Sequence, residues 1–198
     1  MTTNTKDKRI ESILDAAERV FSRYGYPQTN MELLAREAEL SRQGLYLFFR
    51  SKSAVFSAVV ERIQRESLDE AIQAADQARR RGNGAVEILI AQINARAGAY
   101  LTRLKESPYV LELNEESNRQ CPEIVNEYSR KFVTSVADTI TVEDKAGRLN
   151  LPKGVNAKKA AQLIVASARG LKLTSPPPTP SEFKRDLGLI VSLVLNEG

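Results

Sequence analysis

The sequence predicts an all-α fold, and three observations support that prediction. Apolar residues recur at spacings of three and four through most of the chain, which is the period of an amphipathic helix. No segment shows the alternation of apolar and polar residues expected of a half-buried strand. Segments rich in Gly, Pro or charge interrupt the periodic pattern at 79–85, 146–156 and 175–180. The expected structure is therefore a series of helices joined by short breaks.

The composition is that of a folded globular protein. The chain has 198 residues, of which 42% are apolar and 27% are charged. Its N-terminus has no apolar leader, and its longest apolar run, Leu187 to Leu195, is too short to span a bilayer. The single cysteine, Cys121, excludes an internal disulfide framework. These features predict a cytoplasmic protein with no membrane partner.

The absence of histidine argues against most enzyme classes. It removes Ser-His and Cys-His nucleophiles, imidazole metal sites and histidine general bases. The glycine-rich phosphate-binding motifs are also missing. We therefore expect no catalytic residues, no cofactor and no metal, and an enzyme that uses only carboxylates, Lys or Tyr is a distant alternative.

The small positive net charge, +4, is concentrated near the N-terminus. Residues 1–65 hold eleven Lys and Arg against eight Asp and Glu, whereas the remainder is nearly balanced. A polyanionic partner is therefore expected to bind this first third.

Two helices are predicted before residue 39. An apolar stripe from Ile10 to Tyr24 forms the first, and Gly25 ends it. Thr29 and Glu32 have the spacing of a capping box, in which Thr29 caps a second, short helix.

A third short helix and a long fourth one follow. Ser41 is a candidate cap for the third helix, on which Leu45, Phe48 and Phe49 form an apolar stripe. Ser51 can cap the fourth, which continues beyond residue 70.

The remainder of the chain reads as further helices around two loops. Expected helices cover 86–106, 109–120, 123–141, 157–173 and 181–197, with a loop over 146–156. Arg79 to Arg81 reads as a solvated helix end rather than a second site for a polyanion. We divide the chain into an N-terminal domain, 1–50, and a second helical domain, 51–198, with 51–65 as a linking helix.

The second and third helices have the layout of a helix-turn-helix, whose second helix enters the major groove. Arg42 and Gln43 face outward at its start. Arg can form two hydrogen bonds with the edge of guanine, and Gln can form two with the edge of adenine. Gly44 allows close backbone approach. The expected DNA-binding residues are Thr29, Asn30, Ser41, Arg42, Gln43, Gly44, Tyr46, Leu47, Phe48, Ser51 and Lys52. On periodicity alone, Arg42 and Gln43 would be an ordinary solvated face.

This segment resembles the N-terminal signature of the TetR family of bacterial transcriptional regulators over about residues 8–65. The residues that carry the resemblance are Phe21, Tyr24-Gly25, Thr29, Leu34-Ala35, Ala38, Leu40-Ser41, Leu45-Tyr46, Phe49 and Ser51-Lys52. Two positions depart from the family pattern. Glu39 stands where the turn usually has Gly, and Gln43-Gly44 stands where Gly-Thr is common. The first departure predicts strain at a positive φ, and the second prevents the operator sequence from being inferred.

Beyond residue 65 the resemblance is loose, resting on Gly147, Leu149, Ala160-Ala161 and Gly170. It implies a homodimeric repressor of double-stranded DNA with a palindromic operator, released by a small-molecule effector of unknown identity. The expected effector pocket is lined by Tyr100, Leu104, Tyr109, Arg119, Tyr128 and Phe132. The expected dimer interface comprises Leu163, Ile164, Ser167, Leu171, Leu187, Ile190, Val191 and Val194.

Several alternatives stay open from the sequence. The protein can instead be a helical dimeric interaction module that binds another protein and no DNA. Lys6, Lys8 and Arg9 form either a solvated tail or an arm on phosphates. Cys121 reads as an inert thiol rather than a redox sensor, and an activator role fits the same features as repression.

Overall fold

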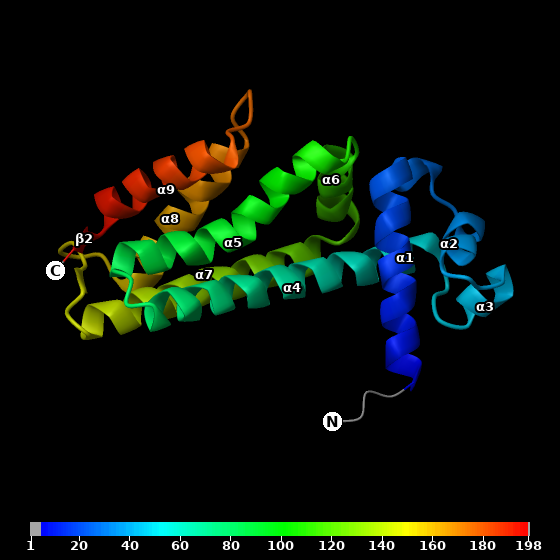
Figure 1. Ribbon diagram of the computed structural model, residues 1–198, viewed down its shortest axis with the longest axis horizontal. Coiled ribbons are helices and arrows are strands. Elements are labelled where there is room, and N and C mark those ends of the chain that lie inside the picture. Colours follow the sequence, from blue (N-terminus) through cyan, green and yellow to red (C-terminus); the bar gives the residue numbers. More distant parts are fainter. Residues whose placement is uncertain (1–4, 198) are drawn as a thin grey trace. The chain divides into compact units, whose positions relative to one another are not determined.

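The computed structural model describes residues 5–197, with the side chains of 98–106 and 196–197 excepted. The described chain is almost wholly helical, as predicted (Figure 1). Its helices are α1 (Thr5–Gln28), α2 (Met31–Glu37), α3 (Arg42–Tyr46), α4 (Lys52–Arg80), α5 (Ala85–Glu106), α6 (Val110–Gln120), α7 (Pro122–Lys145), α8 (Ala157–Lys172) and α9 (Pro180–Val194). Two short strands, β1 (Leu149–Asn150) and β2 (Asn196–Glu197), complete the fold.

The chain forms two compact units. The first contains residues 1–64 and 104–126, and the second contains 65–103 and 127–198. The predicted division placed 104–126 with the C-terminal domain, whereas its contacts group it with the N-terminal helices. The limit of the DNA-binding domain at residue 50 stays a prediction.

The core of the first unit forms where the apolar stripe of α1 meets α2, α3 and the start of α4. Phe21 and Phe56 pack edge to face, with ring centres 5.1 Å apart, and Tyr26 packs against Phe56 at 4.8 Å. Gly25 has φ 75°, so the regular part of α1 ends there, as predicted, and only a short turn follows.

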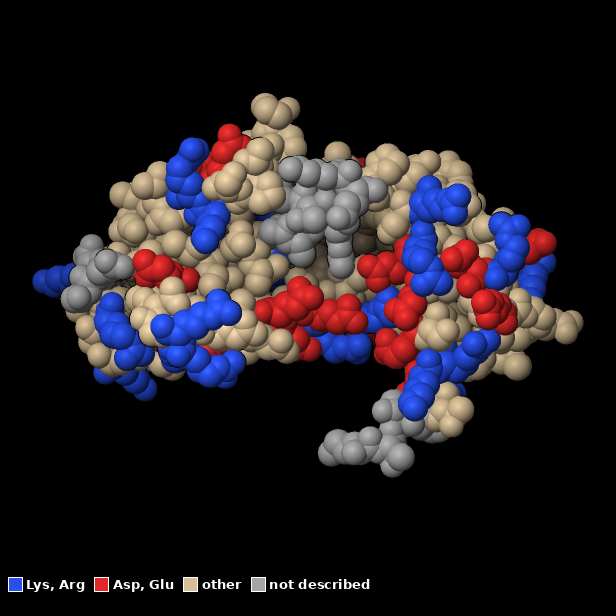
Figure 2. Space-filling model, viewed as in Figure 1, with Lys and Arg blue, Asp and Glu red and all other residues tan. Residues whose placement is uncertain are grey.

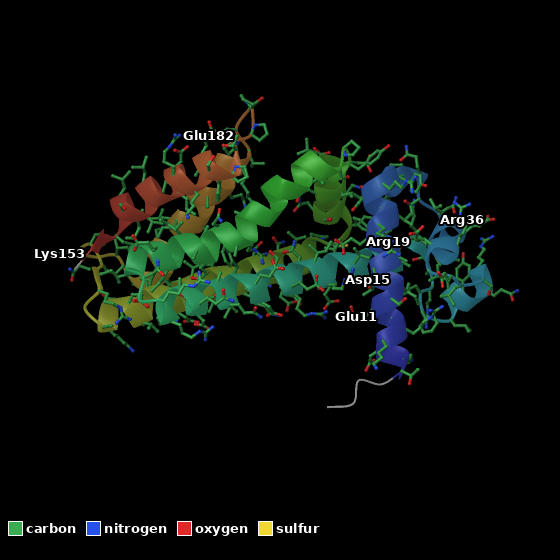
Figure 3. All side chains as sticks on the ribbon, viewed as in Figure 1. Glu11, Asp15, Arg19, Arg36, Lys153 and Glu182 are labelled. Atoms are coloured by element: carbon green, nitrogen blue, oxygen red, sulfur yellow. The ribbon has the colours of Figure 1, made fainter. Side chains whose placement is uncertain are left out.

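Arg62 on α4 joins α1 through its carboxylates. Its side chain is only 5% exposed, and its guanidinium pairs with Asp15 at 2.6 Å, Glu18 at 2.8 Å and Glu11 at 3.4 Å. Glu11 and Asp15 follow one another along α1 in Figure 3. Burial alone would lower the pKa of Arg62, but the hydrogen bonds with Asp15 and Glu18 outweigh burial and raise it. The cluster therefore fixes α1 on α4.

The second unit has its own core, in which α8 and α9 lie side by side (Figure 1). Ile164 of α8 and Phe183, Leu187 and Val191 of α9 are fully buried. A capping box formed by Thr179 begins α9, with Glu182 (labelled in Figure 3) accepting from the Thr179 backbone N–H at 2.8 Å.

A buried carboxylate fixes the end of α7 in this unit. Glu143 is fully buried and pairs with Arg79 at 3.0 Å and Arg148 at 2.6 Å. Burial by itself raises the pKa of Glu143, but the two guanidinium partners outweigh it and lower the pKa. The pair of arginines therefore keeps this carboxylate charged inside the protein.

The prediction that the last helix reaches residue 197 is wrong. Leu195 is extended, with φ −127° and ψ 134°, and caps α9. Asn196–Glu197 then pairs antiparallel with Leu149–Asn150, so a segment of the predicted 146–156 loop is a short strand. None of the described helices is both long enough and apolar enough to cross a bilayer.

Candidate nucleic-acid interface

The second helix is capped by Asn30 rather than by Thr29. The Asn30 side chain accepts a hydrogen bond from Leu33 N at 2.9 Å. Thr29 is buried, and its hydroxyl donates to the Gly25 carbonyl at 2.7 Å. The predicted capping role of Thr29 is therefore wrong, because the turn after Gly25 directs its side chain inward. For the same reason its side chain is not placed to contact DNA.

The turn between α2 and α3 has the predicted positive φ at its non-glycine residue. Glu39 adopts φ 53°, a left-handed conformation that costs a non-glycine residue on the order of 1 kcal/mol. Leu40 N donates to Ala35 O at 2.9 Å and closes the turn. Arg9 of α1 donates through Nη2 to the Ala38 and Glu39 carbonyls, both at 3.4 Å. Arg9 is thus part of the folded domain and supports the strained turn.

The recognition helix begins as predicted. Ser41 caps α3 by accepting from Gly44 N at 2.9 Å. A Cβ at position 44 would lie 3.2 Å from Ser41 Oγ and 3.4 Å from Leu40, so glycine is favoured by the cap itself. Leu45 is fully buried. The α-helix is shorter than the predicted apolar stripe and ends at Tyr46, with Phe48 and Phe49 in the turn beyond it.

The side chains expected to read bases are on the outside of α3. Arg42, Gln43, Tyr46 and Leu47 are exposed, and Leu47 is the most exposed of them at 84%. The Arg42 guanidinium lies 5.7 Å from the Tyr46 ring centre, one helical turn away. A hydrogen bond with the Tyr46 hydroxyl raises the pKa of Arg42, so this cation stays charged. The start of α3 therefore exposes polar side chains that can form paired hydrogen bonds, while its opposite face is apolar.

An open groove runs beside this helix on the surface of the first unit. It has a volume of about 440 Å³ and is lined by Glu32, Ala35, Arg36, Leu40 and Arg42. Figure 2 shows basic and acidic side chains close together over α1, so the face in view has no single sign. The lining of the groove itself has one acidic and two basic residues.

Lys52, a predicted phosphate contact, also holds the end of α1. Its ammonium donates to the Tyr26 carbonyl at 2.9 Å and lies 4.1 Å from the Tyr26 ring centre. Ser51 caps α4 by accepting from Ala54 N at 3.1 Å, as predicted. Lys52 has three donors, so one bond to Tyr26 leaves donors that can meet a phosphate.

Helix α6 contacts the same corner of the first unit. Glu112 accepts from Tyr26 N at 2.9 Å, and the Tyr26 hydroxyl donates to Gln120 at 3.1 Å. Ser57 and Cys121 are within hydrogen-bonding distance at 3.2 Å. Cys121 is therefore a buried thiol with a hydroxyl neighbour. Because Tyr26 also binds Lys52, one residue links α6 to the start of α4.

All of the predicted DNA-binding residues except Thr29 are at least partly exposed. Asn30, Ser41, Arg42, Gln43, Tyr46 and Leu47 are exposed, whereas Gly44, Phe48, Ser51 and Lys52 are half-buried. Sequence reasoning left the role of Arg9 open and missed that of Tyr26. Only the three-dimensional structure shows these roles, because both residues form hydrogen bonds with segments that are distant in sequence.

The predicted effector residues are divided between the two units. Tyr128 and Phe132 are buried on α7 in the second unit. Tyr109 and Arg119 belong to the first, where Arg119 is exposed and ion-paired with Glu116 at 2.5 Å. The side chains of Tyr100 and Leu104 lie outside the described residues. The pocket as predicted from the sequence stays untested.

The predicted dimer interface needs a correction. Ile164, Leu187 and Val191 are fully buried within one chain, so their side chains cannot contact a partner. Leu163 is 43% exposed, and Ser167 is exposed on the same helix. Leu171, Ile190 and Val194 are half-buried. Helix α9 is apolar nearly all round, so periodicity alone did not separate its two faces.

The outward apolar face of α9 carries residues that the prediction omitted. Leu189 is 61% exposed and Leu193 is 85% exposed. Their spacing of four residues places them on one face, away from the buried positions 187 and 191. In the sequence these two leucines form a second apolar stripe on the helix, but periodicity does not tell which stripe is exposed.

A capped helix, a tight turn and a second helix with an outward polar start define a helix-turn-helix protein. Residues 13–59 match the family model described as bacterial regulatory proteins, tetR family. The N-terminal helices thus match the TetR family, whose members are transcriptional regulators and not enzymes. The family resemblance predicted from the sequence is confirmed.

Comparisons with individual proteins agree. The HTH-type transcriptional regulator YfiR of Bacillus subtilis is 38% identical over 76 residues, which cover 38% of this chain and 35% of that regulator. The match thus spans about a third of the relative's length.

Solved structures extend the likeness of fold to nearly the whole chain. SmeT, the repressor of the multidrug efflux pump SmeDEF of Stenotrophomonas maltophilia, has a TM-score of 0.64 at 23% identity, covering 93% of this chain and 87% of SmeT. A transcriptional regulator from Cytophaga hutchinsonii has a TM-score of 0.68 at 22% identity, covering 95% of each chain. The predicted architecture, a helix-turn-helix N-terminus with a helical C-terminal domain, is confirmed.

Proposed function

We propose that the protein is a homodimeric transcriptional repressor that binds a near-palindromic operator and is released from it by a small-molecule effector. The observation that carries DNA binding is the exposed start of α3, where Arg42 and Gln43 project outward while Leu45 is buried beneath them. Arg is suited to the O6 and N7 atoms of guanine, and Gln to the N6 and N7 atoms of adenine.

Dimerisation is supported by the outward apolar face of α8 and α9. Leu189 and Leu193 are exposed one turn apart on α9, and Leu163 is exposed on α8. Contiguous exposed apolar residues are typical of interaction surfaces. In a two-fold dimer the recognition helices would meet successive major grooves about 34–36 Å apart. Leu193→Glu is expected to shift the protein from dimer to monomer in analytical ultracentrifugation, whereas Leu47→Glu, a change at another exposed leucine, should leave the dimer intact.

Release by an effector is supported by the contacts of Tyr26. This residue bonds to Glu112 and Gln120 of α6 and to Lys52 at the start of α4. A ligand that prefers an arrangement in which α6 has moved would therefore disturb a predicted phosphate contact. The reciprocal coupling free energy between such sites is typically about 1–3 kcal/mol.

The test begins by selecting binding sites for the purified protein from random duplex DNA. A palindromic site is expected, with affinity that falls steeply between two salt concentrations as phosphate contacts release counterions. The absence of enrichment at low salt would contradict operator binding. Affinity that hardly changes with salt would favour the rival function, a helical dimer that binds another protein.

Two variants separate base reading from phosphate binding. Arg42→Ala is expected to cost about 1–3 kcal/mol and to relax preference at one base position. Lys52→Ala is expected to weaken binding to all sequences alike, because phosphate contacts carry no sequence information. Unchanged affinity and preference in Arg42→Ala would show that α3 is not the recognition helix.

A further inference from the structure

Two arginines of the second unit reach the same turn of α7. The guanidinium carbon of Arg96, on α5, lies 4.9 Å from the ring centre of Phe132. Arg169, on α8, donates through Nη2 to Ser129 Oγ at 3.2 Å. Ser129 and Phe132 are three residues apart and therefore share one face of α7. Helices α5 and α8 thus bring positive charge to one place on a third helix.

Lys172 adds a third cation. It follows Arg169 by three residues on α8 and therefore lies on the same side of that helix. Burial, together with the charges of Arg169 and Arg96, lowers the pKa of Lys172 to about 8. Burial, together with the charge of Arg169, lowers the pKa of Arg96 to about 10. The fold thus holds three like charges close together although their repulsion disfavours it.

A buried polar atom occurs one turn before Arg96 on α5. Gln92 is 1% exposed, and its Nε2 donates to Ser135 Oγ at 2.7 Å. Its Oε1 accepts no hydrogen bond from the described residues. A buried amide oxygen without a donor costs free energy, which a hydroxyl or N–H group of a ligand could recover.

The surroundings of the cations are apolar on one side. Phe132 and Tyr128 are buried on α7, one turn apart. An arginine fork binds a carboxylate or phosphate through two parallel hydrogen bonds, while an aromatic ring packs against an apolar body. Clustered cations beside apolar rings therefore suit a molecule that is acidic at one end and apolar at the other.

We propose that Arg96, Arg169 and Lys172 bind the acidic group of a small organic acid whose apolar part packs against Phe132. This inference rests on the proposed function, because it names the chemical class of the effector. A carboxylate and a phosphate monoester share the chemistry that the three cations recognise, and the test distinguishes them.

The test compares acids with matched uncharged molecules on the full-length protein. Acetate, benzoate, octanoate and phenyl phosphate are each titrated while thermal unfolding is followed, with acetamide, benzamide and octanamide as neutral counterparts and phenol for the phosphate. At least one of the larger acids is expected to raise the unfolding temperature and to bind about tenfold or more tightly than its neutral counterpart, because charge-assisted hydrogen bonds are the stronger ones. Equal effects of acids and neutral counterparts would overturn the proposal.

Variants assign the effect to the cluster. Arg169→Gln combined with Lys172→Met is expected to abolish the preference for the acid, while Lys158→Met, an exposed change on the same helix, should preserve it. An acid preference that survives in the double variant would overturn the proposal.

Operator binding is measured separately on the same preparations. DNA binding without any preference for acids would overturn the effector class and leave the proposed repressor standing. Acid binding without DNA binding would support the cluster as an acid site and contradict the proposed repressor. Acid binding that weakens DNA binding in the unchanged protein, and not in the double variant, supports both.

Discussion

Arg62 and Arg96 are arginines enclosed by helices, one in each unit, and their surroundings differ in sign. Arg62 lies among the carboxylates of Glu11, Asp15 and Glu18, which raise its pKa. Arg96 lies against an aromatic ring and near Arg169, and its pKa is lowered. The first arrangement neutralises a buried cation with residues of the same chain and is a structural device. The second brings two arginines together, and it is the place where we propose that an anion binds.

The two units also differ in where their binding groups lie. In the first, Arg42, which is proposed to contact bases, is exposed at the start of α3, where a large polyanion can reach it. In the second, Arg96 and Lys172 are half-buried and Arg169 is exposed on α8, and the partner that we propose for them is a small acid.

The variant with the largest expected effect tests whether buried packing holds the exposed side chains of α3 in place. Leu45→Ala should lower the free energy of unfolding by about 2–5 kcal/mol, because it removes a fully buried side chain and leaves a cavity. Leu47→Ala, at the exposed neighbouring position, should change it by no more than about 0.5 kcal/mol. Urea unfolding measures both. Equal effects would mean that α3 does not pack as described.

The structural role of Arg62 is tested next. Arg62→Met should cost about 1.5–3 kcal/mol, because charge-assisted hydrogen bonds to α1 are lost. The matched change Arg19→Met breaks an exposed pair with Glu37 and should cost less than about 1 kcal/mol. If Arg62→Met were neutral in urea unfolding, the contrast drawn with Arg96 would fail.

Glu143 is a buried charged residue of the second unit that corresponds to Arg62 in the first. Arg79 and Arg148 balance its charge. Glu143→Gln should cost about 1–3 kcal/mol at neutral pH, since Arg79 and Arg148 lose a charged acceptor. Because the folded pKa of Glu143 is lowered from 4.5, its contribution is present above that pH and is lost as the pH falls through the folded value. Unfolding measured from pH 7 to 3 should therefore show the variant and the original protein converging in acid.

The smallest expected effect concerns the strained turn of the first unit. Glu39→Gly should stabilise the protein by up to about 1 kcal/mol, because glycine adopts φ 53° without a steric penalty. Arg36→Gly, within α2, should instead destabilise by about 1 kcal/mol. Thermal unfolding distinguishes the two. A loss of stability in Glu39→Gly would show that the Glu39 side chain contributes more than its backbone strain costs.

Much of the first unit could be predicted because its signals are local. The apolar stripe of α1, the stop at Gly25 and the caps at Ser41 and Ser51 depend on residues a few positions apart. The positive φ at residue 39 followed from the family pattern of the turn. The failure at Thr29 has a tertiary cause, since the packing of the turn gave its hydroxyl to Gly25 and left capping to Asn30.

The second unit could be predicted less well, because its decisive features join distant segments. Periodicity placed α8 and α9, but only the packing of one on the other decided that Leu187 and Val191 are inside while Leu189 and Leu193 are outside. The pairing of Asn196–Glu197 with Leu149–Asn150 likewise has no local signal.

By itself the sequence determined the helical period, the helix boundaries set by caps and glycines, and the family of the N-terminal domain, because each depends on neighbouring residues. The tertiary structure decided which apolar faces are buried, which carboxylates surround Arg62, and that Arg96 and Arg169 approach the same turn of α7. Those outcomes depend on how helices pack across long stretches of chain, where side-chain shape and desolvation rather than local spacing select the partners.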